Sequence, residues 1–377
     1  MQLRNFTEAG PALSLLGFGT MRLPVKGKNQ SDIDEEKALE MIDCAYESGV
    51  NYFDTAHMYH DQASEPFIGK ALSRYRRETF HLATKMPPWN LKSKGDAERV
   101  FDGQLKKCGV DYFDFYLMHC ITRETFPTFE KYGVYEFLLE QQKKGKLRRL
   151  GFSLHDNNEL LKQVVAKWDF QFALMQMNYF DWDGQNAKEL HQTLAGRNIP
   201  IFVMEPVRGG MLASLSPESA KVLQEADPTH SIASWAMRFA AGLPGVVTVL
   251  SGMTTLDQVK DNVATYKNFT PLTPTEQEAI VKAVDIYRKS GAVPCTACRY
   301  CVPCPVGVDI PHAFAVYNAF KKQGSAGTFR MHYEMIGDGS LPENCTSCGQ
   351  CLPLCPQHLD IPALMGQIAK AYENPKG

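Results

Sequence analysis

The sequence has almost no net charge, because 40 lysine and arginine residues are set against 42 aspartate and glutamate residues, for a formal charge of −2. This balance gives no argument for a nucleic acid or an anionic membrane as a partner. The N-terminus, MQLRNFTEAG, lacks the basic stretch and apolar run of a signal peptide. Long apolar segments such as SIASWAMRFAAGLPGVVTVL are interrupted, here by Arg238 and Pro244, so we expect no membrane span. We therefore expect a cytoplasmic protein.

Cysteine is scarce over the first 294 residues, where only Cys44, Cys108 and Cys120 occur. Scattered cysteines of this kind are typical of small, buried apolar positions. The other eight of the 11 cysteines form two runs, CTACRYCVPCP from Cys295 and CTSCGQCLPLCP from Cys345. In a cytosolic protein, C-x-x-C spacing indicates metal ligands rather than disulfides.

Short apolar runs alternate with longer amphipathic segments from about residue 13 to 265. The runs are LLGFGTM, YFDTA, FHLATK, FDFYLMH, LRRLGFSL, FALMQMN, IPIFVMEP and GVVTVLSG. Several of the segments between them end on Gly or Gly-Lys, a common helix stop. Eight strand–helix units of roughly 30 residues predict parallel strands joined by helical crossovers, which in one domain of this size is an α/β protein with a (β/α)8 TIM barrel.

A doubly wound sheet is the competing α/β architecture, and it would place a G-x-G-x-x-G turn after its first strand. Here the first turn reads GFGTMRLP, which lacks the third glycine and continues into proline instead of a helix. The barrel is therefore the better interpretation.

The alternating pattern stops near residue 270, where Thr273 and Pro274 form a plausible N-cap and first turn of one more helix. We expect residues 1–270 to form the barrel, 271–291 a connecting helix, and 292–377 a second domain.

The second domain contains its own repeat. The segments CPVGVDIP and CPQHLDIP share the spacing C-P-x-x-x-D-I-P, and each aspartate is placed to cap a helix that begins at I-P. Two copies of a ligand, loop and helix unit predict a small, mostly α-helical domain with pseudo-two-fold symmetry.

The spacing of the cysteines is typical of iron–sulfur ligands. The pattern C-x2-C-x2-C-x3-C-P is that of bacterial ferredoxins, in which the fourth cysteine of each run binds the other cluster. The second run matches it fully, and the first is one residue short before its fourth cysteine. This implies two [4Fe-4S] clusters, one held by Cys295, Cys298, Cys301 and Cys355, the other by Cys345, Cys348, Cys351 and Cys304. The alternative is two structural zinc sites, although zinc usually takes two ligand pairs separated by a longer loop. The region resembles the helical ferredoxin modules that are appended to larger oxidoreductases.

Catalytic groups of a barrel lie at the C-terminal ends of its strands. There the sequence places Asp54, Lys85 and His119, and Tyr59 follows in the loop after the second strand. These four residues resemble the tetrad of the aldo-keto reductases, whose most recognisable motif is similar to YFDTAHMYHDQASEPFIGKAL. The resemblance extends through GFGTMRL, DYFDFYLMH, GFSLHD, QMNYF, EPVRGGML and LSGMTTLDQVKDN, and so covers nearly all of residues 11–265.

Carbonyl reduction requires a hydride on carbon and a proton on oxygen. A tyrosine, with an ordinary pKa near 10, is a suitable acid, and a neighbouring lysine ammonium stabilises its phenolate and lowers that pKa. We therefore expect Tyr59 to act as acid/base, Lys85 to tune it, Asp54 to hold the lysine, and His119 to position the carbonyl oxygen. Trp89, Tyr179 and Trp182 are candidates for the substrate pocket or for rim and core packing.

The resemblance also implies an extended nicotinamide dinucleotide, NADPH with NADH as the alternative. Its nicotinamide end would contact Ser153 and Gln176, and Met204 where the family commonly has an aromatic residue that stacks on the nicotinamide. Two neighbouring positions also differ from the family, with Leu154 in place of asparagine and Glu205 in place of serine. The pyrophosphate would follow EPVRGGML. Lysine and arginine commonly bind the ribose phosphate, but this chain has Gly252 and Gln258 at these positions, so backbone amides and Arg208 are expected to substitute. The full set of implied cofactor residues is Gly19, Thr20, Met21, Asp54, Ser153, Gln176, Met204, Pro206, Val207, Arg208, Gly210, Gly252, Met253, Thr254, Gln258, Asp261 and Asn262.

Two functions are compatible with these features. The first is an NAD(P)H-dependent oxidoreductase that reduces an aldehyde or ketone, or oxidises the alcohol, and carries two clusters for structure or for exchange with a redox protein. The second is an electron-transfer, docking or redox-sensing module whose barrel binds NADP(H) without significant turnover. The complete tetrad favours the enzyme, with a small carbonyl or alcohol as substrate.

Overall fold

A computed structural model describes residues 1–27, 29–183 and 186–374. The chain forms two compact units, of which the first comprises Met1–Pro206 and Ala236–Leu272. The second comprises Val207–Trp235 and Thr273–Gly377. This division differs from the one expected from the sequence, because the second unit takes in the segment that follows the seventh barrel strand as well as the cysteine runs.

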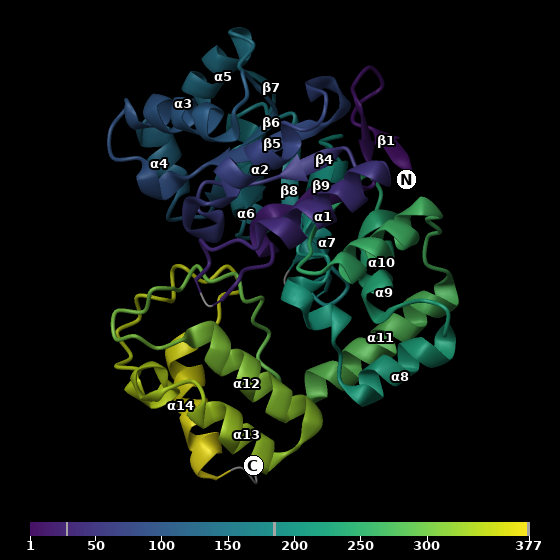
Figure 1. Ribbon diagram of the computed structural model, residues 1–377, viewed down its shortest axis with the longest axis vertical. Helices are drawn as coiled ribbons and strands as arrows, with labels where there is room; N and C mark the ends of the chain where they lie inside the picture. Colours follow the sequence, from purple (N-terminus) through teal and green to yellow (C-terminus); the bar gives the residue numbers. More distant parts are fainter. Residues whose placement is uncertain (28, 184–185, 375–377) are drawn as a thin grey trace. The chain divides into compact units, whose positions relative to one another are not determined.

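The first unit is a closed parallel barrel, as the alternating pattern predicted (Figure 1). In the described residues its eight strands follow one another in chain order, and the last pairs with the first. The strands are β3 (Leu16–Gly19), β4 (Tyr52–Asp54), β5 (His81–Met86), β6 (Phe113–Ile121), β7 (Leu147–Leu154), β8 (Phe172–Gln176), β9 (Ile201–Met204) and β10 (Val246–Gly252). Each corresponds to one of the eight apolar runs.

Helices cross over between the strands. They are α1 (Glu35–Glu47), α2 (Ser64–Leu72), α3 (Asp96–Cys108), α4 (Phe126–Lys131), α5 (Val134–Lys143), α6 (Asn158–Lys167), α7 (Ala187–Ala195), α9 (Ile232–Gly242) and α10 (Leu256–Lys267). Their ends follow capping rules. Helix α3 begins at Asp96, where an acidic side chain interacts favourably with the helix dipole. It ends at Cys108, and the following Gly109, with φ of 63°, forms a left-handed C-terminal cap.

A short hairpin of β1 (Leu3–Asn5) and β2 (Ala12–Ser14) precedes the barrel. Phe6, directly after β1, makes edge-on contacts with Phe115, Phe172 and Phe202, at centroid distances of 5.3, 6.2 and 6.0 Å. These aromatic rings belong to one buried apolar cluster. Each fully buried ring contributes about 1.5–3 kcal/mol relative to exposure. Phe115, Phe172 and Phe202 lie early in their strands. The aromatic core therefore fills the end of the barrel where the strands begin, and polar side chains lie at the opposite end, where the strands end.

The second unit is mainly helical. Its helices are α8 (Pro217–Ala226), α11 (Pro274–Lys289), α12 (Ile310–Gln323), α13 (Ala326–Glu334) and α14 (Ile361–Glu373). The predicted N-cap at Thr273 is confirmed, because its side chain accepts a hydrogen bond from the backbone N–H of Glu276. The Glu276 carboxylate in turn accepts from the backbone N–H of Thr273, which completes a capping box. Asp309 and Asp360 also cap α12 and α14 as predicted.

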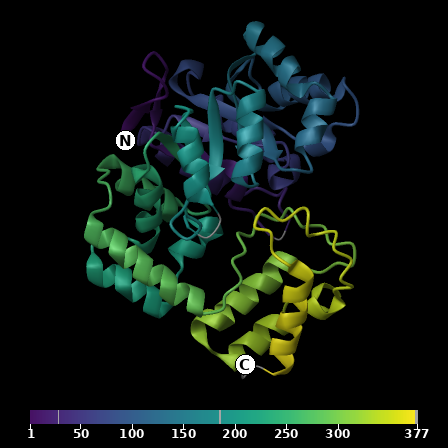
Figure 2. The same cartoon turned by 180° about the vertical axis from the view of Figure 1, so that it is seen from behind.

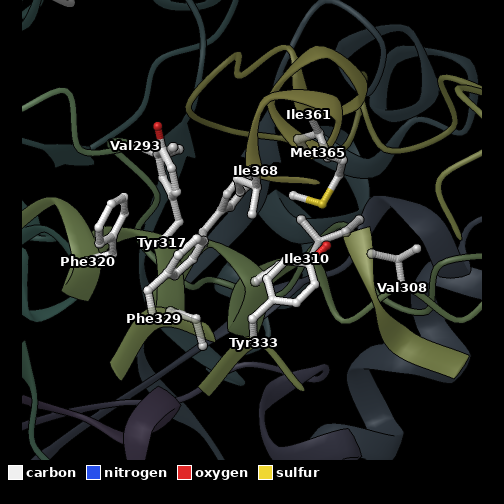
Figure 3. Packing of buried hydrophobic residues seen from close by; sticks show 13 residues of the cluster. Val293, Val308, Ile310, Tyr317, Phe320, Phe329, Tyr333, Ile361, Met365 and Ile368 are labelled. Atoms are coloured by element: carbon white, nitrogen blue, oxygen red, sulfur yellow. The ribbon is translucent and has the colours of Figure 1, made fainter. Parts of the chain in front are cut away.

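Helices α12, α13 and α14 pack side by side (Figure 2). Their shared core contains Tyr317, Phe329, Tyr333, Met365 and Ile368, all nearly inaccessible to solvent (Figure 3). Six of the eight clustered cysteines lie against this core. The thiols and the helices are therefore parts of one packed structure.

Across the described residues, none of the helices combines the length and the apolar character needed to cross a membrane.

Candidate active site and cysteine centre

The four tetrad candidates lie at or beyond the C-terminal ends of three successive strands. Asp54 is the last residue of β4, Lys85 is the last but one of β5, and His119 is near the end of β6. Tyr59 begins a short 3-10 segment, η2 (Tyr59–Gln62), in the loop after β4. Parallel strands in a barrel bring their C-terminal ends to the same rim, so side chains far apart in sequence meet there.

Lys85 is the centre of this group, with a side chain only 1% exposed. Its Nζ donates to Asp54 Oδ1 at 2.5 Å, to the carbonyl oxygen of Thr55 at 2.8 Å and to Tyr59 Oη at 3.3 Å. An ammonium has three N–H donors, and these three acceptors use all of them. The second carboxylate oxygen of Asp54, Oδ2, is buried and has no hydrogen-bond partner among the described residues.

The charges of the Lys85–Asp54 pair support each other. Burial alone would lower the pKa of Lys85, but the attraction of Asp54 and Tyr59 outweighs it, so the pKa is raised and the lysine stays charged. Burial raises the pKa of Asp54, and Lys85 opposes that rise. A buried pair of this kind is stable only while both partners are present.

Burial also sets the pKa of the other two groups. It raises the pKa of Tyr59, whereas the nearby Lys85 acts in the opposite direction, as expected from the sequence. The net direction is upward, so the Tyr59 hydroxyl is protonated at neutral pH. Burial, aided by Lys85, holds the pKa of His119 well below its usual range. The His119 ring lies 6.3 Å from that of Tyr59 and 5.6 Å from that of Trp89, measured between centroids.

The backbone after Tyr59 is left-handed at three consecutive non-glycine residues, His60, Asp61 and Gln62, with φ of 51°, 49° and 76°. This conformation is unfavourable outside glycine and persists only where neighbouring contacts hold it. The His60 ring supplies them: its Nε2 accepts from the N–H of Leu23 at 3.1 Å, and its Nδ1 lies 2.9 Å from the carbonyl oxygen of Gln30. A ring that accepts at Nε2 is neutral and donates at Nδ1, and burial lowers the pKa of His60 accordingly. Sequence reasoning missed this role.

A second group that sequence reasoning missed is the buried carboxylate of Glu65, on α2 behind Lys85. Its Oε1 accepts from Thr84 Oγ1 at 2.8 Å and from Gln104 Nε2 at 2.7 Å. Gln104 Nε2 also lies 2.9 Å from the carbonyl oxygen of Lys85. These hydrogen bonds hold the C-terminal end of β5, and with it the backbone of Lys85, in place. A charged residue inside the apolar stretch SEPFIGKAL is the signal that could have identified it.

Most of the implied cofactor residues follow the strand ends of the first unit. Ser153 is near the end of β7, where its Oγ accepts from the N–H of Cys120 at 2.8 Å. Gln176 ends β8 and donates to Asp181 Oδ2 at 2.7 Å, which holds its amide in place. The remaining members at this rim lie at or just beyond three strand ends. They are Gly19, Thr20 and Met21 at the end of β3, Met204 and Pro206 at the end of β9, and Gly252, Met253, Thr254, Gln258, Asp261 and Asn262 from the end of β10 into α10.

Arg22 is a cation that sequence reasoning did not assign. Gly19 and Gly252 pair in register at the ends of β3 and β10. A Cβ atom on Gly252 would lie 3.2 Å from the Arg22 side chain, so that side chain passes over the glycine. Its Nη2 forms an ion pair with Glu205 Oε1 at 3.3 Å, and the two side chains are 24% and 17% exposed.

Three of the implied cofactor residues, Val207, Arg208 and Gly210, lie in the second unit. Arg208 is fully buried and donates to the carbonyl oxygen of Pro294 and, at 2.8 Å, to Gln357 Oε1. The guanidinium is thus engaged within the second unit. The expectation that it substitutes at the ribose phosphate does not fit this placement.

The other aromatic candidates separate into two groups. Trp89 is 39% exposed and contacts His119, which places it at the rim of the site. Tyr179 and Trp182 instead pack edge-on against Phe239, at 6.1 and 5.5 Å between centroids.

The clustered cysteines of the second unit form two groups of four. Burial is the main cause that raises the pKa of Cys301 to about 12. The neighbouring thiols of Cys298, Cys295 and Cys355 also contribute to the rise. Burial likewise raises the pKa of Cys351, whose thiol neighbours come from the other set, Cys345, Cys348 and Cys304. Each group contains three cysteines of one run and the fourth cysteine of the other run. That exchange is the arrangement of a two-cluster ferredoxin.

A cavity provides space beside the second group. It is lined by Cys304, Cys345, Cys348 and Cys351 and also by Cys301 of the first group, and Val308, Ile310, Ile361 and Met365 are among its apolar walls. It contains about 570 Å³ of empty space counted to its opening. Within the ranges described, no three His, Cys, Asp or Glu side chains converge on a single-ion position. The fit to an iron–sulfur cluster therefore rests on a donor set of four thiols and on the cavity that they line.

Two protein-family models match this chain, one over the barrel region and one over the cysteine region. A family model described as "Aldo/keto reductase family" matches residues 15–285, and one described as "4Fe-4S dicluster domain" matches residues 294–359.

Individual relatives cover the first of these regions. An "Uncharacterized oxidoreductase YqkF" of Bacillus subtilis is 26% identical over 76% of this chain and 99% of the relative. The NADH-specific methylglyoxal reductase of Escherichia coli is 24% identical over 67% of this chain and 89% of the relative. Among solved structures, the holo form of aldo-keto reductase AKR11C1 from Bacillus halodurans is 28% identical, covers 75% of this chain and 96% of that chain, and superposes with a TM-score of 0.62.

Proposed function

The chain belongs to the aldo/keto reductase family and carries a 4Fe-4S domain, and on that premise we propose that it reduces a small aldehyde or ketone with NADPH, or oxidises the corresponding alcohol. The observation that carries the proposal is the buried Lys85 ammonium, which contacts both Asp54 and Tyr59 at the rim of the barrel.

The bound dinucleotide would supply the hydride for the carbonyl carbon. Tyr59 donates its proton to the carbonyl oxygen as negative charge develops there, and its raised pKa keeps that proton available at neutral pH. Lys85, held by Asp54 and by the Thr55 carbonyl, stabilises the phenolate that remains. His119 is neutral and hydrogen-bonds the substrate oxygen, which orients the carbonyl toward Tyr59.

NADPH is favoured over NADH because a cation lies beside Gly252. The Arg22 side chain passes over this glycine, and Thr254 Oγ1 donates to the Arg22 carbonyl at 2.9 Å. Arg22 thus stands in for the cationic residues missing at positions 252 and 258. A guanidinium forms strong, charge-assisted hydrogen bonds with a phosphate group.

Two [4Fe-4S] clusters complete the proposal, within a ferredoxin-like region of residues 292–377 that follows a barrel of residues 1–270 and a helix of residues 271–291. The exchange of the fourth cysteine between the two thiol groups supports this ligand assignment. The clusters stabilise the helical core, or exchange electrons with a redox protein. The proposed ligands are Cys295, Cys298, Cys301 and Cys355 for the first cluster, and Cys345, Cys348, Cys351 and Cys304 for the second.

Tyr59→Phe tests the function. Loss of the general acid should lower kcat for model aldehydes by about 10²–10⁴-fold, while NADPH affinity stays unchanged. Tyr52→Phe is the control, because Tyr52 is a buried tyrosine whose hydroxyl has no hydrogen-bond partner among the described residues. A Tyr59→Phe variant that keeps most of its turnover would show that Tyr59 is not the acid. NADPH binding by the unaltered protein without turnover of any carbonyl would favour the sensing or docking role.

A further inference from the structure

The pairing of β6 with β7 becomes irregular near the C-terminal ends of the two strands. Their register shifts between Met118 and Ile121. Two residues of β6, His119 and Cys120, therefore lie opposite one residue of β7, Ser153, which makes this a β-bulge. Bulges bend a strand and re-aim a side chain, and they are common beside active sites. The bulge here contains the imidazole that orients the carbonyl in the proposed function.

Cys120 has an unfavourable backbone conformation within the bulge. Its φ of 55° lies in the left-handed region, where Cβ comes too close to the following carbonyl oxygen. Such a conformation persists only where neighbouring contacts hold it. The N–H of Cys120 donates to Ser153 Oγ at 2.8 Å, and its carbonyl oxygen accepts from Thr125 Oγ1 at 2.6 Å. Both backbone polar groups of this residue are therefore bonded to side chains.

The turn that leads into α4 holds the Thr125 hydroxyl in place. Thr125 directly precedes that helix, and its Oγ1 accepts a hydrogen bond from the N–H of Thr122 at 2.8 Å. A hydroxyl group has a single O–H donor, and the Thr122 contact leaves that donor available for the carbonyl oxygen of Cys120. The start of α4 is thereby connected to the bulge in β6.

The conformation of Cys120 limits where the imidazole of His119 can lie, because the two residues share a peptide bond. The His119 ring lies 6.3 Å from the ring of Tyr59 and 5.6 Å from that of Trp89, measured between centroids. In the proposed function, His119 and Tyr59 act on the same carbonyl oxygen. A displacement of about 1 Å in such an arrangement can cost about 10²-fold in rate.

We propose that Thr125 is a positioning residue, whose hydroxyl holds the left-handed bulge at Cys120 and thereby keeps His119 in place to bind the carbonyl oxygen. This inference rests on the proposed function, because it takes His119 as the group that orients the substrate. Ser153 makes the other hydrogen bond to the bulge, but it also belongs to the implied cofactor residues, so a change there would alter two sites at once. Thr125 lies outside that set and can be tested separately.

Thr125→Val in the full-length protein tests the proposal. Valine keeps the shape of threonine and removes the hydroxyl, so the bulge loses one of the hydrogen bonds that hold it. With benzaldehyde as the model substrate, we expect kcat/KM to fall about tenfold, because the imidazole is displaced. The Kd for NADPH should stay unchanged. Thr125→Ser keeps the hydroxyl and should retain most of the activity.

Thr79→Val is the control for the loss of such a hydrogen bond elsewhere. Thr79 Oγ1 also donates to a backbone carbonyl oxygen, that of Arg76, at 2.6 Å. Thr79 lies just before β5, at the end of the barrel where the strands begin. Its substitution should therefore leave kcat/KM unchanged.

A second substitution, at Cys120, distinguishes positioning from a general loss of stability. Glycine adopts positive φ about as readily as negative φ, so Thr125→Val/Cys120→Gly should recover kcat/KM about threefold over Thr125→Val. Thr125→Val/Cys120→Ala also removes the thiol but keeps a Cβ atom, so it should recover nothing. In a crystal structure of Thr125→Val, we expect φ of Cys120 to become negative and the distance between the His119 and Tyr59 rings to exceed 6.3 Å.

A double-mutant cycle with His119→Asn separates this inference from the proposed function. If Thr125 acts through His119, Thr125→Val should lower kcat/KM by less than about twofold in the His119→Asn background. An equal loss in both backgrounds, native kcat/KM in Thr125→Val, an unchanged φ at Cys120, or equal recovery by Cys120→Ala and Cys120→Gly would overturn the positioning role and leave the proposed reductase intact. Native kcat/KM in His119→Asn would instead contradict the role of His119 in the proposed function.

Discussion

Replacement of Lys85 by methionine should destabilise the barrel strongly and in a pH-dependent way. The substitution removes the ammonium from a site that is 1% exposed and leaves Asp54, which is 4% exposed, without its partner at 2.5 Å. Breaking a buried ion pair by removing one partner costs about 3–5 kcal/mol, because a buried charge is left uncompensated. Above neutral pH we therefore expect the free energy of unfolding to fall by that amount.

The cost should diminish in acid. The unfolded-state pKa of aspartate is about 3.9. In the folded variant the pKa of Asp54 lies higher, since burial already raises it in the native protein and the opposing Lys85 is gone. A raised carboxyl pKa destabilises the fold at pH values above it, and this loss is recovered as the pH falls through it toward the unfolded value.

Urea unfolding at pH 8 and pH 5, followed by tryptophan fluorescence, measures both effects. Three of the four tryptophans, Trp89, Trp168 and Trp182, lie in the first unit, so the signal reports mainly on the barrel. The double variant Asp54→Asn/Lys85→Met, which buries no charge, should recover most of the lost stability at pH 8. A cost below about 1 kcal/mol at pH 8, or a cost equal at both pH values, would refute the ion-pair reasoning.

Three further results are expected. Arg22→Ala should raise the Kd for NADPH about tenfold and leave the Kd for NADH nearly unchanged, because only NADPH carries the extra phosphate. Fluorescence titration measures both constants, and an equal loss of affinity for the two cofactors would show that Arg22 does not bind the phosphate. Cys348→Ala should lower anaerobic iron content from about eight atoms per chain toward about four and destabilise the helical region, while kcat with saturating NADPH persists; zinc in place of iron would contradict the cluster assignment. Since the pKa of His119 lies well below its usual range, kcat should show no ionisation near pH 6.5; an inflection there that His119→Asn removes would contradict a neutral imidazole.

The barrel and the tetrad positions were predictable from the sequence because they depend on local patterns. Strand-length apolar runs and amphipathic segments between them determine the order of elements, and parallel strands must bring Asp54, Lys85 and His119 to one rim. The caps at Asp309 and Asp360 follow the same logic, since a side chain bonds an N–H only three residues away. Cysteine spacing likewise carries the ferredoxin pattern, because one tight loop presents three thiols.

The tertiary structure decided which side chains support these groups. Gln104 reaches the Lys85 carbonyl across 19 positions, and Arg208 reaches Gln357 across 149. No local pattern encodes such pairs, because they depend on how helices and loops pack after the elements have formed. Sequence reasoning therefore expected Arg208 at the ribose phosphate, whereas packing buries it beside the cysteine loops and brings Arg22 over Gly252 instead. Local periodicity determined the elements and their order, and the long-range burial of charged side chains determined which of them serve the site.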